Sequence, residues 1–68
     1  MAKVEIFTTA GDEPFVFDMK RNVALLIDNW SCGKGADHFH FDHMQKHWIF
    51  KRTNVVAVCI DYEADANA

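Results

Sequence analysis

Sixty-eight residues are enough for one hydrophobic core and too few for two domains. Half of the residues are hydrophobic, which excludes a disordered chain, and ten acidic against seven basic side chains leave no cationic footprint for nucleic acid. No apolar run reaches the length of a membrane-spanning helix, and the N-terminus starts with strand-like alternation rather than an apolar leader. We therefore expect one domain over residues 1–62, located in the cytoplasm and without a membrane partner.

The first predicted element is a β-hairpin. Residues 3–9 alternate with the period of two that a half-buried strand requires, with Val4, Ile6 and Thr8 on one side and Glu5, Phe7 and Thr9 on the other. Residues 10–14 contain a glycine and a proline, which favour a turn, and residues 15–17 then resume an apolar run. The two apolar segments are predicted to pair as antiparallel strands.

A helix is predicted from Met19 to Ser31. Asp18 precedes it and can act as the N-cap, because its carboxylate accepts hydrogen bonds from free N–H groups of the first turn. Gly33 follows it and can take the left-handed conformation that ends a helix. Apolar side chains recur at helical spacing on one face. They are Met19, Val23, Leu26, Ile27 and Trp30.

Three further strand-like segments follow the helix. Residues 38–42 alternate between polar and aromatic side chains, and residues 48–50 and 55–62 are rich in aromatic and β-branched types. A turn at residues 51–54 is predicted to join the last two segments as a hairpin. The tail at residues 63–68 has no apolar anchor and is predicted to be disordered.

These elements predict an α+β fold of order ββαββ(β). The strands would form one antiparallel sheet of four to five strands, with the helix packed on one face. One helix covers only one face of such a sheet, so the second face is a candidate for self-association into a homo-oligomer or for binding a partner protein. The residues predicted for this interaction surface are Phe7, Val16, Ile49, Val55 and Cys59.

The chain opens with Lys-Val-Glu-Ile-Phe-Thr-Thr, continues with a predicted helix that ends in an aromatic residue, and closes with the segment Trp-Ile-Phe-Lys-Arg-Thr-Asn-Val-Val-Ala-Val-Cys-Ile. In these segments, which cover most of its length, it resembles short orphan proteins of bacterial phages and prophages. The resemblance implies a small non-enzymatic protein that binds and modulates a host protein, in the host cytoplasm if the chain is phage-encoded. It implies no particular site residue, and the histidines and tryptophans of this chain depart from the pattern.

The densest chemical feature is the histidine-rich stretch from His38 to His47. Residues 38–43, His-Phe-His-Phe-Asp-His, match the His-x-His-x-Asp-His string of the metallo-β-lactamase superfamily, where these residues bind zinc and activate water for hydrolysis. That superfamily needs a much longer fold and further ligands downstream, whereas no histidine follows His47. The sequence therefore predicts no enzymatic activity and no required cofactor.

A zinc-type metal site on the histidine-rich strand is the first alternative function. On a strand, His38, His40 and Asp42 project from one face at intervals of about 7 Å, and imidazole and carboxylate groups suit zinc. Candidates for the remaining ligands are His43, Cys32 and His47. The competing interpretation is that the alternate aromatic residues enter the core and leave the histidines on the solvated side of an exposed strand. The sequence leaves both open.

Two more features have a chemical and a structural interpretation. Cys32 and Cys59 are expected to be free thiols in a reducing compartment, although the sequence does not exclude a disulfide between them.

A nucleic-acid-binding module is the second alternative function, with cations and an aromatic residue near the turn at residues 51–54. Its members would be Lys46, His47, Phe50, Lys51 and Arg52. The acidic composition disfavours it, so the leading prediction is an interaction protein.

Overall fold

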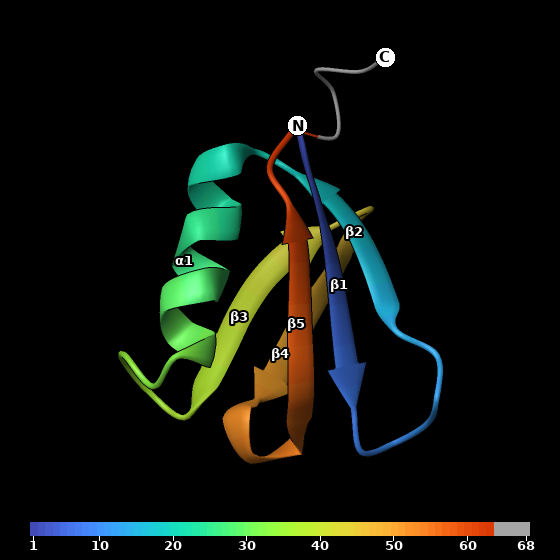
Figure 1. Cartoon of the computed structure of the whole chain (residues 1–68), viewed down its shortest axis with the longest axis vertical. Coiled ribbons are helices and arrows are strands. Elements are labelled where there is room, and N and C mark those ends of the chain that lie inside the picture. Colours follow the sequence, from blue (N-terminus) through green and yellow to red (C-terminus); the bar gives the residue numbers. More distant parts are fainter. Residues whose placement is uncertain (64–68) are drawn as a thin grey trace.

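Two antiparallel β-sheets and one α-helix make up the fold in the computed structural model, which describes residues 1–63 (Figure 1). In chain order the elements are β1 (Ala2–Thr8), β2 (Phe15–Met19), α1 (Arg21–Ser31), β3 (His38–His43), β4 (Lys46–Lys51), the 3-10 turn η1 (Arg52–Asn54) and β5 (Val55–Asp61). One sheet has the strand order β2-β1-β5, and the other consists of β3 and β4. Within residues 1–63, no helix is long and apolar enough to cross a membrane.

The predicted first hairpin is confirmed. β1 and β2 pair antiparallel, with Val4 opposite Phe17 and Ile6 opposite Phe15. This register places Val4, Ile6 and Phe17 on the inner face, where each is almost completely buried. Alternation with period two therefore determined both the strand pairing and the face that became the core.

The helix begins two residues later than predicted, and the expected Asp18 cap is wrong. β2 continues to Met19, which pairs with Ala2, so Asp18 lies in a strand with its side chain exposed. Lys20 occupies the N-cap position and provides no side-chain hydrogen bond. Extending the strand buries Met19 to 6% exposure, and burial of a methionine stabilises the fold more than one exposed cap does.

The other end of the helix agrees with the prediction. α1 ends at Ser31, and Gly33 has the left-handed φ of 104° that closes it. The buried side of the helix consists of Ala24, Ile27 and Trp30. Leu26, predicted to lie on the buried side, is 56% exposed.

The predicted single sheet of four to five strands does not form, and the strands are divided between two sheets. β4 does not continue into a hairpin with β5, because η1 redirects the chain and β5 pairs with β1 instead. In that ladder Ile60 lies opposite Val4 and Val58 lies opposite Ile6, so β5 adds its apolar face to the same core. The α+β class with all-antiparallel pairing is confirmed, and its strands are divided between two sheets.

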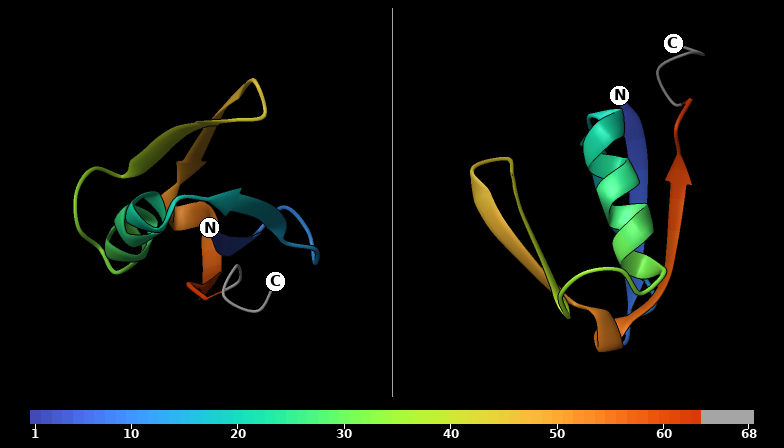
Figure 2. Two further views of the ribbon diagram at one scale, coloured as in Figure 1. Left: turned by 90° about the horizontal axis from the view of Figure 1, so that it is seen from above. Right: turned by 90° about the vertical axis from the view of Figure 1, so that its left-hand side faces the viewer.

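Aromatic side chains hold the two sheets together. The sheets meet near η1 and diverge from it, with α1 along the inner face of the three-stranded sheet (Figure 2). Phe17 packs edge-on against Phe41 and Trp48, at 5.0 Å between ring centroids in both cases, and against Phe50 at 6.1 Å. The buried core comprises Ala2, Val4, Ile6, Phe17, Met19, Ala24, Ile27, Trp30 and Phe50.

Tyr62 ties the end of β5 to the helix. Its hydroxyl donates a hydrogen bond of 2.9 Å to Oδ2 of Asp28, and the guanidinium of Arg21 lies 5.5 Å from its ring. Burial of the phenol, together with the hydrogen bond to the Asp28 carboxylate and the negative charge of that group, raises the pKa of Tyr62 above its usual value of 10.0. The predicted disordered tail lies, apart from the exposed Glu63, outside the described residues.

We expect this raised pKa to be directly measurable, because Tyr62 is the single tyrosine of the chain. Ultraviolet absorbance of the tyrosinate should rise at a higher pH than in the unfolded protein, and Asp28→Asn should move the midpoint back down. Because folding raises the pKa, the stabilisation by Tyr62 is complete below its usual pKa and is lost as the pH rises through the folded-state value. A titration midpoint identical in the folded and unfolded protein would contradict this assignment.

Candidate functional site

The histidine-rich strand β3 presents its two faces to different environments. Phe39 and Phe41 are half-buried and pack against the core, whereas His38, His40 and Asp42 are exposed on the opposite, outer face. The strand patterning proposed as the competing interpretation is therefore present. It does not by itself exclude a metal, because the exposed side chains remain available.

His43 does not share the surface of the other predicted ligands. It is half-buried on the inner side of β3, its ring stands 5.2 Å from that of Phe17, and its Nε2 lies 3.1 Å from the Asp18 carbonyl oxygen. That carbonyl belongs to β2, so His43 joins the hairpin to the three-stranded sheet. The four residues predicted as one ligand set are thus divided between two faces.

The structure brings together a different set, which we call the histidine pair: His40 and His47, with Asp42 beside them. β4 pairs with β3 so that His47 is opposite Asp42, and His40 lies diagonally from it on the same outer face. Nδ1 of His47 is 2.7 Å from Oδ1 of Asp42, and Nε2 of His47 is 3.3 Å from Nδ1 of His40. All three side chains are exposed.

One assignment of the ring protons satisfies both of these contacts. The ionised carboxylate of Asp42 only accepts hydrogen bonds, so neutral His47 carries its proton on Nδ1 and donates it to Asp42. Nε2 of His47 then holds a lone pair, which accepts the Nδ1 proton of His40. In this arrangement the remaining lone pair of the two rings is on Nε2 of His40.

One chain does not assemble a full metal site. Among residues 1–63, no three histidine, cysteine, aspartate or glutamate side chains are arranged to hold a metal ion together. Cys32, a candidate ligand, lies at the C-terminal end of α1, where its Sγ is 4.0 Å from Oδ1 of Asp28. Cys32 and Cys59 are both exposed free thiols, so no bridge joins them.

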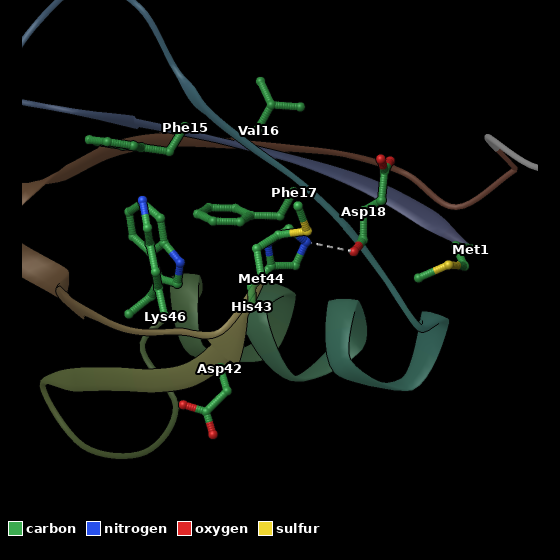
Figure 3. A pocket seen from close by; sticks show the side chains of 10 residues that line it. Met1, Phe15, Val16, Phe17, Asp18, Asp42, His43, Met44 and Lys46 are labelled. Atoms are coloured by element: carbon green, nitrogen blue, oxygen red, sulfur yellow. Dashed lines mark hydrogen bonds between the residues drawn. The ribbon is translucent and has the colours of Figure 1, made fainter.

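The second feature is a groove of about 850 Å³ between β2 and the tip of the β3–β4 hairpin (Figure 3). Its walls are mainly apolar, and its exposed members include Phe15, Val16 and Met44. Figure 3 shows the hydrogen bond from His43 to the Asp18 carbonyl crossing it. The lining residues are Met1, Phe15, Val16, Phe17, Asp18, Asp42, His43, Met44, Lys46 and Trp48.

The predicted interaction surface is only partly one surface. Phe7, Val16 and Cys59 share the outer face of the three-stranded sheet, where Glu5 stands between Val16 and Cys59. The remaining two members lie elsewhere. Val55 packs toward the core beyond a bulge in the β1–β5 ladder, and Ile49 is on the outer face of the other sheet, opposite His40.

Two members of the predicted nucleic-acid patch have structural roles. Phe50 is 8% exposed and belongs to the core, so its ring cannot stack on a base. Arg52 donates hydrogen bonds to the carbonyl oxygens of Trp30, Lys34 and Ala36 at 3.0, 2.7 and 3.0 Å. Its guanidinium is thus occupied by the loop after α1, and the predicted patch retains Lys46, His47 and Lys51 as its exposed members.

Comparison of the chain with known protein families, with curated proteins and with solved structures gave no match.

Proposed function

We propose that the protein is a non-enzymatic interaction protein, which binds an extended apolar segment of a partner protein along β2. The observation that carries this proposal is the groove of about 850 Å³ beside a strand that ends its sheet. Addition of a strand to an open sheet edge obtains affinity from main-chain hydrogen bonds and specificity from neighbouring side-chain pockets. β2 offers an open edge for such main-chain bonds, and the groove beside it offers a side-chain pocket.

The backbone of β2 supports this mode of binding. Within residues 1–63, β2 pairs only with β1, so in this part of the chain one side of β2 has no neighbouring strand. The Asp18 carbonyl points to that open side, where His43 contacts it. In a strand, alternate residues direct their backbone groups to the same side, so the N–H and carbonyl of Val16 also point to the open edge.

The side chains near this edge favour an apolar segment. Phe15 is 38%, Val16 50% and Met44 80% exposed, which is a large apolar area for a protein of this size. Asp18 and Lys46 also line the groove, and their opposite charges would limit binding to one register. We place this activity in the cytoplasm, and in the host cytoplasm if the chain is phage-encoded.

Proline at position 16 tests the proposal, because it removes a main-chain donor at the open edge without removing a bond to β1. We expect Val16→Pro to lose partner binding and Val16→Thr, which is similar in shape and keeps the N–H, to retain it. Binding is measured by photo-crosslinking from position 15 in cells that naturally make the protein. A crosslinker at Leu25, an exposed apolar residue of α1, is the matched control.

Three results would contradict the proposal. They are equal crosslinking in the proline and threonine variants, the same adducts from position 25 as from position 15, and an absence of protein adducts from position 15. Circular dichroism and a urea melt of Val16→Pro confirm that the variant is folded before the comparison is made.

A further inference from the structure

We propose that His40 and His47 form one half of a zinc site, which a second copy of the chain completes. The proposal concerns the outer face of the β3–β4 hairpin and is independent of partner binding at the β2 edge. It assigns to the histidine pair a ligand class, a divalent zinc-type cation, and a partner, another molecule of the same protein.

The distance between the two ring nitrogens matches a tetrahedral metal site. Zinc binds imidazole nitrogen at about 2.0 to 2.1 Å, and at the tetrahedral angle two such nitrogens are about 3.3 Å apart. Nδ1 of His40 and Nε2 of His47 are 3.3 Å apart. Both rings are exposed, so a change of the His40 tautomer and small rotations of the rings can direct a lone pair from each to one metal ion without disturbing the core.

Asp42 gives His47 the orientation that metal ligands usually have. A zinc-bound histidine commonly donates its other ring N–H to a carboxylate, which fixes the tautomer and the ring and makes the ligand nitrogen more basic. Nδ1 of His47 stands 2.7 Å from Oδ1 of Asp42, which leaves Nε2 as the ligand atom. The carboxylate also offsets part of the charge of the cation.

A second copy is required because one chain supplies only half of the ligands. Structural zinc sites have four ligands, and among residues 1–63 no group of three His, Cys, Asp or Glu side chains could hold a metal ion together. A twofold axis through the metal brings the same two histidines from a second molecule and completes an all-nitrogen site. Metal binding at Nδ1 of His40 requires the ring proton to move to Nε2, so the neutral imidazole is the ligand.

The surface around the pair suits contact between two copies. Ile49 is opposite His40 on the same outer face and is 54% exposed, so a twofold contact here would remove an apolar side chain from water. The core of so small a protein stabilises the folded state only weakly. Metal binding and dimer formation would therefore add substantially to the free energy of unfolding.

The test is titration of metal-free protein with zinc sulfate, with molar mass measured by light scattering and bound zinc by a competing chromophoric chelator. We expect a dimer with one zinc per two chains, which EDTA returns to the monomer. His40→Ala and His47→Ala should each abolish the zinc-dependent dimer. His38→Ala, which removes an exposed histidine from the same face, should leave it intact.

Asp42→Asn tests the role of Asp42, which orients the His47 ring but is not itself a zinc ligand. We expect zinc affinity to fall about 10- to 100-fold, with the dimer still forming at higher zinc. The proposal is overturned by the absence of a zinc-dependent dimer, by one zinc bound to a monomer, or by an equal effect of His38→Ala and His47→Ala. Crosslinking at position 15 should be unchanged in His47→Ala, so failure here is distinguishable from failure of the partner-binding proposal.

Discussion

Replacement of Phe17 with alanine is expected to leave much of the protein unfolded at room temperature. Phe17 is 2% exposed, and its ring touches those of Phe41, Trp48 and Phe50 across the junction of the two sheets. Truncating a buried phenylalanine typically costs about 3 to 5 kcal/mol, and a domain of this size has about 3 to 5 kcal/mol in total. The loss is therefore comparable with the whole free energy of unfolding.

Equilibrium urea unfolding, followed by tryptophan fluorescence and circular dichroism, measures this loss. Phe15→Ala is the matched control, because Phe15 belongs to the same strand but is 38% exposed, and we expect it to cost about 1 to 2 kcal/mol. Phe17→Leu keeps most of the buried volume, so it should remain folded and lie between the two. A cost of Phe17→Ala no larger than that of Phe15→Ala would show that the sheets are not joined through this ring.

Arg52→Ala should have the second-largest effect. The guanidinium donates to the carbonyl oxygens of Trp30, Lys34 and Ala36, and it lies 5.5 Å from the Trp30 ring. These bonds satisfy carbonyls at the end of α1 and in the loop that leads to β3. A hydrogen bond from a charged group contributes about 1.5 to 3 kcal/mol, and since this site is partly open to water, we expect a total loss of about 2 to 3 kcal/mol.

Two substitutions control for charge. Lys51→Ala removes a neighbouring exposed cation and should change stability by less than about 0.5 kcal/mol. Arg52→Lys keeps the charge but not the planar set of donors, so it should recover only part of the loss. Amide exchange of residues 33–37 should accelerate in Arg52→Ala. If Lys51→Ala costs as much as Arg52→Ala, the effect is one of net charge and not of these hydrogen bonds.

The elements with a clear local pattern were predictable from the sequence. Alternation in residues 3–9 predicted β1, and Gly33 marked the end of α1. Alternating aromatic residues placed Phe39 and Phe41 toward the core. In each case, the preference of a few consecutive residues agrees with the packing that the whole chain adopts.

Elements that depend on distant contacts were not predictable in this way. The local sequence predicts Asp18 as a helix cap and Met19 as the start of the first turn. Pairing of both residues with β1 overrides that preference. β5 pairs with whichever strand offers the larger apolar face, and this strand is β1 and not β4. Because β1 is far away in the sequence, a local pattern carries no information about that pairing.

The histidine pair was missed as a set for a similar reason. Its geometry follows from the two-residue turn at Met44 and Gln45, which both have positive φ, 55° and 64°. Such turns are usually marked by asparagine or glycine, and neither is present here. Without the turn the register of β3 and β4 is unknown, so a diagonal contact between His40 and His47 could not be derived from spacing alone.

The ladder between β1 and β5 also has a consequence for how the protein folds. Lys3 pairs with Asp61, so nearly all of the described chain lies between the two residues of that pair. Closing so long a loop has a high entropic cost, whereas the β1–β2 and β3–β4 hairpins close locally. We expect the hairpins to form early and β5 to dock last. Substitutions that weaken only the β1–β5 ladder should then accelerate unfolding far more than they slow folding.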